Sequence, residues 1–571
     1  MINNNNNNNN NNKINISWFI TIVFSTIFIL ACRLFYLQFI LTNHLEVLSE
    51  KNFARNHDVK PFRGLIVDSQ NRPLASNQSI NNLIWQGTGQ NRLTEEQKKL
   101  IKKLEEIIEL INKESISVTE KYSKELIIAK NIPRKILFKI LQLFSGHPNL
   151  KISNNIQREY PHGCLASHII GYLGLADSSG KMGLERICES LLAGSYGKNK
   201  LTINAFGALI DSNQLTPAKE GENIKITINI NLQQIAEELF PVNISGAMIL
   251  MDPTNGDLCT VISRPNFDPN LFLEPITNKQ WQELTATGPF INRAFNATYP
   301  PASLFKLITI TAALEEGIIT TDQEWTCYGY TTFAKRRYHC SRHHGHGRVN
   351  TKQALAHSCN IPFFNIAQNI SIDTLSLYAH KFGLGEPTGI FMDEKSGLIP
   401  NNKWKIITKK ERWWPGETLS AVIGQSYLLV TPIQMARMVG GIVEGYLVKP
   451  RLLTEEPIIK NNLNISLNTR NFLLEAMKTA ITIGTGKRLN KIKDITVYAK
   501  TGTAQTSSLE KRDQGQKFKE HTWFIGSMQY QNTKPLIIVT IFEHCGDHKE
   551  ILSFIKKFLM RYRSYCSENK Q

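Results

Sequence analysis

The chain has 571 residues, a length that predicts two or three domains, and its 42% hydrophobic content is typical of a globular protein with a sizeable core. The formal net charge of +18 favours an anionic partner, but the lysines are spread along the chain and no zinc-finger, homeodomain or RNP pattern supports nucleic acid. Nine cysteines, an odd number in a chain this long, exclude the dense disulfide framework of a small secreted scaffold.

The N-terminal region begins with an asparagine tract at Asn3 to Asn12, which cannot build a core and is predicted to be disordered. From Ile14 to Cys32 the residues are uncharged and mostly apolar for long enough to span a bilayer. The bulky sequence Arg33-Leu34-Phe35-Tyr36 offers no cleavage site, so an uncleaved anchor is favoured over a signal peptide, with a buried core helix as the alternative. We predict a cytoplasmic tail over 1–13 and a transmembrane anchor over 14–36.

The region after the anchor reads as short strands and helices without catalytic motifs. Residues 61–75 predict a strand, a turn and a second strand. The apolar spacing from Thr94 to Ile111 predicts an amphipathic helix that starts with a capping box between Thr94 and Gln97. A strand over 224–228 and a helix over 231–240 follow. We predict a non-catalytic domain over 37–241, with a boundary near Val242.

Strand patterns return after this boundary. Gly246 to Met251 and Leu258 to Ser263 are apolar runs joined by a turn that contains Asn-Gly, which indicates a hairpin. Further strands are predicted at 496–499, 522–528 and 536–542, and a last helix at 549–560. Strands at both ends with helices between them predict an antiparallel sheet closed by the first and last segments, with an inserted helical lobe. The expected class is therefore α+β, with this domain over 242–571.

The first motif of this domain is Tyr299-Pro300-Pro301-Ala302-Ser303-Leu304-Phe305-Lys306. The prolines should hold the chain extended, and apolar residues at helical spacing start after them, so Ser303 is expected near a helix N-terminus with Lys306 one turn on. A lysine with a lowered pKa can take the proton of a serine hydroxyl, and a helix N-terminus offers N–H groups to an oxyanion. The motif alone is equally typical of a helix N-cap followed by a solvated lysine.

Two further motifs follow, Ser358-Cys359-Asn360 and Lys500-Thr501-Gly502-Thr503. In the first, a hydroxyl and an amide two residues apart can face one cleft while Cys359 points into the protein. In the second, a strand ending in Lys-Thr-Gly would present a cation and hydroxyls, with Gly502 allowing a ligand close to the backbone. Each motif alone is equally typical of an ordinary turn or strand end, but the three together, in this order, are a strong signal.

The three motifs resemble the signature of the penicilloyl-serine transferases. The wider sequence resembles class B penicillin-binding proteins, and Cys327 to Tyr330 with Gly345 to Asn350 fits the elongation-type penicillin-binding protein 2 best. Ala302 departs from the family's usual glycine, and Cys359 from the aspartate of Ser-Asp-Asn. The other segments that carry the resemblance are 33–38, 63–68, 252–256, 424–425, 431–432 and 504–505.

The resemblance implies a β-lactamase-like transpeptidase domain, preceded by a pedestal or dimerisation domain. It implies a peptidoglycan DD-transpeptidase of cell elongation that β-lactams inhibit. Ser303 would attack the penultimate D-Ala carbonyl of a stem peptide, and Lys306 would be the base. Lys500 would lower the pKa of Lys306 and bind the substrate carboxylate.

The remaining roles concern the substrate. Ser358 would relay a proton to the leaving amine, and Asn360 would hold the donor amide. Thr501, Gly502 and Thr503 are the expected substrate-binding residues. The oxyanion would lie between the backbone N–H groups of Ser303 and Thr503.

A second cluster lies between the motifs: Cys327, Cys340, His346 and Cys359. Three thiolates and an imidazole are a typical tetrahedral zinc set, although the spacing matches no zinc finger. A Cys327–Cys340 disulfide and free buried cysteines are the alternatives. The resemblance implies a structural zinc ion, because relatives can carry one in this stretch.

The resemblance also implies a single-pass protein of the inner membrane with its catalytic domain in the periplasm. Peptidoglycan stem peptides, a SEDS-type glycosyltransferase and elongation scaffold proteins would be its partners. The charges that flank the anchor, Lys13 and Arg33, are too balanced to set the orientation. The alternatives are a catalytically silent scaffold homologue, the division-specific class B enzyme and a carboxypeptidase. His521 either lines the cleft or is a satisfied strand histidine.

Overall fold

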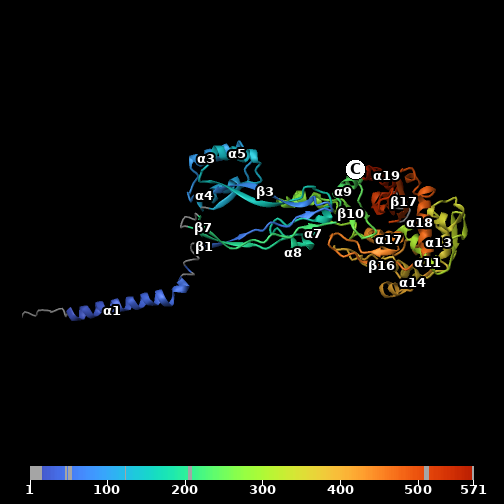
Figure 1. Ribbon diagram of the computed structural model, residues 1–571, viewed down its shortest axis with the longest axis horizontal. Coiled ribbons are helices and arrows are strands. Elements are labelled where there is room, and N and C mark those ends of the chain that lie inside the picture. The colour runs from blue at the N-terminus through green and yellow to red at the C-terminus, as the bar shows by residue number, and fades with distance from the viewer. Residues whose placement is uncertain are drawn as a thin grey trace, which may run out of the picture. The chain divides into compact units, whose positions relative to one another are not determined.

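The computed structural model describes residues 16–45, 48, 54–122, 124–203, 209–506 and 514–568 (Figure 1). The asparagine tract and the predicted tail over 1–13 lie outside the described residues. The chain divides into two compact units, one made of Met1–Pro61 and Gly194–Glu220 and the other of Phe62–Ala193 and Gly221–Gln571.

The first unit holds the expected anchor. Helix α1 (Ile16–Phe35) continues as the π-helical turn η1 (Tyr36–Ile40). Trp18–Ile40 is long and apolar enough to cross a membrane, with a mean hydropathy of 2.1 and no buried residue. The same unit contains an antiparallel sheet in the order β1-β6-β7, formed by Ala54–Val59, Gly197–Ile203 and Leu209–Thr216.

The second unit starts with a lobe built around the long strand β3 (Pro73–Gln86), which pairs with β5 (Leu150–Glu159) along most of its length. Helix α3 (Glu95–Glu105) has the predicted capping box, but it ends before the predicted Ile111. The N–H of Ile111 instead donates to the carbonyl of Ile128, so pairing with a neighbouring strand overrides the helical spacing.

The other elements of this lobe are short. The predicted strand over 224–228 is reduced to β8 (Ile224–Lys225), which pairs in parallel with β2 (Ile66–Val67). The remaining bounds are β4 (Glu125–Ala129), α4 (Ile116–Lys121), α5 (Arg134–Phe144), α6 (Ser167–Ile170), α7 (Gly183–Ile187) and α8 (Glu189–Leu192). Helix α9 (Ile230–Leu239) follows β8 and packs on the sheet of the next region.

A buried ionic network ties three segments of this lobe together. The Glu185 carboxylate is inaccessible to solvent and accepts hydrogen bonds from the Nε atoms of Arg63, over 2.7 Å, and Arg158, over 2.8 Å. Arg63 also pairs with Glu189 over 2.6 Å. Each buried charge therefore has a partner of opposite sign, which such burial requires.

The region that contains the three motifs is organised around a five-stranded antiparallel sheet in the order β10-β9-β19-β18-β17. The first strand of the region, β9 (Gly246–Met251), pairs with the last, β19 (Leu536–Phe542), so the predicted closure by first and last segments is confirmed. The other strands are β10 (Leu258–Arg264), β17 (Ile495–Ala504) and β18 (His521–Tyr530). Strand β17 runs through Lys-Thr-Gly, so the prediction that the strand ends there is wrong.

Alternate residues of this sheet face two cores, as the period of a strand requires. Met248 and Leu250 pack with helices α9 and α19 (His548–Glu568), whereas Ile249 and Met251 face the core that contains α17 (Pro432–Glu444).

The inserted lobe comprises α10 (Asn278–Thr285), α11 (Lys306–Glu315), α12 (Thr351–Ala356), α13 (Ile361–Ile366), α14 (Ile372–Lys381), α15 (Asn402–Lys409), α16 (Pro415–Ala421) and α18 (Leu467–Thr482). Its hairpins are β11 (Glu324–Cys327) with β14 (Gly347–Asn350), β12 (Tyr330–Phe333) with β13 (Arg336–His339), and β15 (Tyr446–Val448) with β16 (Lys460–Asn462).

Candidate active site

Ser303 lies in a single 3₁₀ turn, η4 (Ala302–Leu304), immediately before α11. Pro301 has a helical ψ of −18°, so the extended chain ends earlier than predicted, and Ala302 turns it with a φ of +49°. The indole of Trp523 donates to the carbonyl of Pro300 over 3.1 Å. The serine is therefore held at the start of the helix by the sheet behind it.

Lys306, the first residue of α11, is completely buried beneath this turn. Its Nζ donates to the carbonyl of Ser358 and to Oδ1 of Asn360, both over 2.8 Å, and to Oγ of Ser358 over 3.2 Å. Burial lowers the pKa of Lys306 to about 8. An amine with this pKa is partly neutral at physiological pH and can accept a proton.

The second motif occupies the turn between α12 and α13, where Ser358 has a φ of +55°. The amide of Asn360 donates to the carbonyl of His339 over 3.1 Å, which fixes its orientation. The side chain of Cys359 is fully buried, on the side away from the cleft, as the alternation of side chains predicts.

Lys500 lies on β17, and its buried Nζ donates to the carbonyl of Thr501 over 2.9 Å. Burial and then the charge of Lys306 hold the pKa of Lys500 well below its usual range. We expected the field of Lys500 to lower the pKa of Lys306, but burial is the cause there. We expected Gly502 to allow a ligand close to the backbone. The structure gives a further reason for glycine, because a Cβ there would lie 3.1 Å from Cγ of Leu304 and crowd the turn that carries Ser303.

These motifs meet at one cleft of about 520 Å³. Its lining includes seven of the predicted residues, which are Ser303, Ser358, Asn360, Thr501, Gly502, Thr503 and the metal-ligand candidate Cys340. Lys306 and Lys500 are buried rather than exposed in its wall. The cleft thus combines serine and threonine hydroxyls and an amide with two lysine amines that are kept from water.

The sequence assigned no role in the site to several other cleft residues, which are Gln425, Thr485, Glu520, His339, His343, His357 and His548. Thr485 is the clearest case, since Thr501 donates its hydroxyl proton to Thr485 over 2.7 Å. The close approach of Gly484 to the carbonyl of Ala356 places Thr485 there, and a lone Gly-Thr-Gly gives no local sign of it. His521 is a buried strand histidine whose Nδ1 accepts the N–H of His544 over 3.0 Å.

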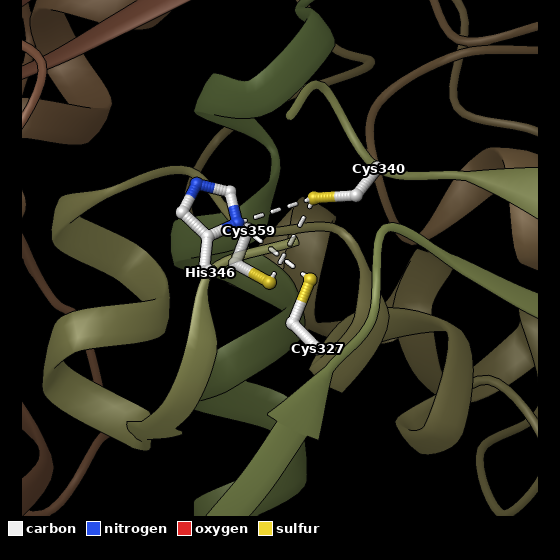
Figure 2. Close-up of side chains that lie close together, drawn as sticks. All are labelled: Cys327, Cys340, His346 and Cys359. Atoms are coloured by element: carbon white, nitrogen blue, oxygen red, sulfur yellow. Dashed lines mark hydrogen bonds between the residues drawn. The ribbon is translucent and has the colours of Figure 1, made fainter. Parts of the chain in front are cut away.

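The four residues of the cysteine cluster point toward one another (Figure 2). Their ligand atoms all lie within 4.8 Å of each other. Sγ of Cys340 is 3.8 Å from Sγ of Cys359 and 3.4 Å from Nδ1 of His346, and Sγ of Cys327 is 3.7 Å from the same nitrogen. A tetrahedral zinc ion with ordinary bond lengths needs separations of about 3.5–3.8 Å, so the donor set fits such an ion. Cys327 and Cys340 are free thiols in the structure.

Comparisons with known proteins agree with this arrangement. The sequence model of the penicillin-binding protein transpeptidase domain matches residues 246–550, and that of the penicillin-binding protein dimerisation domain matches 58–226. The chain is 28% identical to the peptidoglycan D,D-transpeptidase MrdA of Acinetobacter baumannii, over 92% of this chain and 84% of that protein. It is 29% identical to MrdA of Escherichia coli, over 74% of this chain and 71% of that protein.

Solved structures give the same result for the fold. A peptidoglycan synthase complex contains a chain with 26% identity and a TM-score of 0.76, matched over 96% of this chain and 98% of that one. Penicillin-binding protein 2 of Helicobacter pylori, solved with MreC, has 24% identity and a TM-score of 0.75, over 90% and 99% of the two chains. The chain therefore belongs to the class B penicillin-binding proteins, in the elongation-type group of penicillin-binding protein 2.

Proposed function

We infer that the chain is a peptidoglycan D,D-transpeptidase of cell elongation that works through an acyl-serine intermediate. The observation that carries this function is the convergence of Ser303, Ser358, Asn360 and Thr501 on one cleft beside two buried lysines. The family membership and the MrdA relatives support the same activity. A silent scaffold would not need to keep every reacting group in place.

In the proposed mechanism, Oγ of Ser303 attacks the carbonyl of the penultimate D-Ala, and neutral Lys306 takes the hydroxyl proton. The N–H groups of Ser303 and Thr503 stabilise the oxyanion. The bond to the terminal D-Ala then breaks, and its amine receives a proton through Ser358. The amine of a neighbouring stem peptide attacks the ester, which forms the cross-link and restores the serine. Asn360 holds the donor amide, and the cleft-lining hydroxyls of Thr501 and Thr503 bind the carboxylate. Lys500 was expected to bind that carboxylate, but its amine is buried and does not line the cleft, so its place is beneath the wall.

Acylation by a fluorescent penicillin tests the nucleophile. The wild-type chain should be labelled and Ser303→Ala should not. Ser341→Ala is the matched control, because Ser341 lines the same cleft, and it should be labelled normally. A folded wild-type protein that stays unlabelled, or a Ser303→Ala variant that is labelled, would overturn the assignment.

We propose that Cys327, Cys340, His346 and Cys359 hold a structural zinc ion. Their donor atoms suit its coordination, and four protein ligands leave no position for catalysis. The N–H of Asn360 approaches Sγ of Cys340 at 3.4 Å, and Cys359 stands between Ser358 and Asn360. A bound zinc ion would brace the second catalytic motif from behind.

We further propose that the anchor is a single inner-membrane span with the catalytic region in the periplasm, beside a SEDS-type glycosyltransferase and scaffold proteins. The apolar helix and the complexes in which similar chains were solved support this placement. Protease added to intact spheroplasts should digest the catalytic region. Protection until the inner membrane is permeabilised would contradict the orientation.

A further inference from the structure

A cluster of aromatic rings borders the catalytic cleft, in a segment to which the mechanism gives no role. We call it the rim cluster, and its rings are those of Tyr338, Trp404, Trp413, Trp414 and Tyr427. The Trp404 and Tyr427 rings lie 5.1 Å apart, and those of Trp413 and Tyr427 6.4 Å apart. All five rings are at least partly exposed to solvent. Trp414 is the exposed one of the five, and the other four are half-buried. An exposed apolar patch rimmed by polar residues is a mark of a binding surface.

The rim cluster is held in place by a buried charge. Lys405 is almost inaccessible, pairs with the carboxylate of Glu417 and lies 5.6 Å from the ring of Trp413. The same carboxylate accepts the N–H of Trp414 over 3.0 Å, and the indole of Trp413 donates to Thr418 over 2.9 Å. Because several hydrogen bonds already hold this loop in place, little conformational entropy is lost when a ligand binds to Trp414.

Two chain connections place the rim cluster next to the catalytic cleft. Tyr427 is two residues from the cleft-lining Gln425, so their Cα atoms are at most about 7 Å apart. Tyr338 directly precedes His339, which also lines the cleft. The Tyr338 hydroxyl lies 3.4 Å from where a Cβ of Gly416 would be, so this hairpin meets the loop that carries Trp414. The rim cluster is thus continuous with the established site.

The charges on the rim cluster indicate the class of ligand. An exposed cation lies against three of its rings: Arg336 at 5.6 Å from Tyr338, Lys409 at 5.5 Å from Tyr427 and Arg412 at 4.1 Å from Trp414. Residues 402–414 include five basic side chains and one acidic one. Pyranose rings present C–H groups that pack on aromatic faces, and guanidinium groups bind carboxylates.

We propose that the rim cluster binds the glycan backbone of the peptidoglycan strand whose stem peptide occupies the cleft. The inference rests on the transpeptidase function, because the stem peptide in the cleft must be attached to a glycan that passes close by. The sugar rings of such a strand match the aromatic faces, and the free carboxylates of its stem peptides match the cations, because the muramic acid carboxyls themselves form the amide links to those peptides. The rim cluster would give the enzyme affinity for polymeric substrate that an isolated stem peptide lacks.

The probe is a set of glycan strands stripped of peptides by an amidase, which frees the muramic acid carboxylates. Binding to the full chain in detergent is measured by saturation-transfer NMR and by titration. We expect the wild type to bind the strands, Trp414→Ala to bind at least fivefold more weakly, and Arg412→Gln to lose the preference for these strands over neutral chitin oligosaccharides. Trp281→Ala is the matched control, since Trp281 is 46% exposed and Trp414 is 48% exposed.

Acylation by penicillin, which carries no glycan, is measured on the same variants. Equal acylation of wild type, Trp414→Ala and Trp281→Ala would show that the cleft is intact, so a loss of glycan binding belongs to the rim cluster. Equal glycan binding by Trp414→Ala and wild type would overturn the proposal. So would a wild-type protein that reacts with penicillin but does not bind the glycan strands. Failure of acylation in the wild type would instead count against the transpeptidase function.

Discussion

The main-chain N–H of Ala302 donates to the carbonyl of Gly424 over 2.9 Å, and the two residues approach so closely that no side chain fits at Gly424. Gly424 has a φ of +75°, and a Cβ there would lie 2.0 Å from the carbonyl oxygen of Ala302. Ala302 itself has a left-handed φ and directly precedes Ser303. The position of the nucleophile therefore depends on a glycine more than a hundred residues away.

Gly424→Ala should displace the turn that carries Ser303. The left-handed φ alone costs about 1 kcal/mol for alanine, and the backbone clash adds to it. We expect the second-order rate of penicillin acylation to fall at least tenfold. Gly389→Ala is the control, because Gly389 has a φ of +82° but only the Lys449 side chain, at 3.7 Å, near a new Cβ. Equal acylation by the two variants would contradict this role of Gly424.

Asn360→Asp should slow acylation through Lys306. It would place a carboxylate at the atom that now lies 2.8 Å from Nζ of Lys306. A carboxylate there stabilises the ammonium form and raises the pKa of Lys306, and each unit of increase leaves about tenfold less neutral amine at pH 7. Stopped-flow acylation at pH 7 should be at least tenfold slower than for wild type or for Asn365→Asp in the adjoining helix α13. An unchanged rate would argue against Lys306 as the base.

Metal analysis should find about one zinc ion per chain, and a strong chelator should lower both the melting temperature and the acylation rate. Cys359→Ala should lose the metal. Cys188→Ala, which changes another buried thiol outside the cluster, should keep it. A protein that contains no zinc and acylates normally after treatment with a chelator would rule out the metal site.

Folding stability should depend on pH through His168. This ring is buried, its Nε2 donates to the carbonyl of Pro289 over 2.6 Å, and burial lowers its pKa to about 4. The unfolded chain binds the proton more readily, with a pKa near 6.5, so the contribution is complete above pH 6.5 and is lost as the pH falls toward 4. It amounts to at most about 3 kcal/mol.

His168→Gln should reduce the dependence of folding stability on pH between 6.5 and 4. Thermal unfolding of the variant should change less between pH 6.5 and 4 than that of the wild type or of His162→Gln, a partly exposed histidine. A variant with the same pH slope as the wild type would show that other groups dominate the acid response.

The catalytic sheet and the order of the motifs could be predicted from the sequence, because both depend on patterns within short stretches of the chain. Residues 246–263 and 536–542 alternate between two cores, and each motif keeps its reacting groups within a few residues. The end of α3 could not be predicted, because the N–H of Ile111 leaves the helical pattern for the carbonyl of Ile128. Such a competition is decided by tertiary pairing rather than by spacing.

The pKa values of the site lysines also could not be predicted from the sequence. A pKa depends on how completely a side chain is buried, and nothing local shows that Lys306 and Lys500 lie beneath the cleft wall. Glu520 and His548 line the cleft because β18 and α19 pack beside β17, so their positions follow from the assembled sheet. The cysteine cluster, by contrast, could be predicted from its ligand types and the family resemblance, and the structure brings the same four residues together.

The pairing of β9 with β19 has a consequence for how the protein is made. The two strands are about 285 residues apart, so at roughly 5–20 residues per second the second leaves the ribosome some 15–60 s after the first. Until then β9 has an open edge, which is a site for mispairing and for chaperone binding. A nascent chain that stops after Ala504 would already contain every reacting group but would lack β18 and β19, the strands that lie between β9 and β17 in the sheet. Such a chain should be degraded rather than act as a partial enzyme.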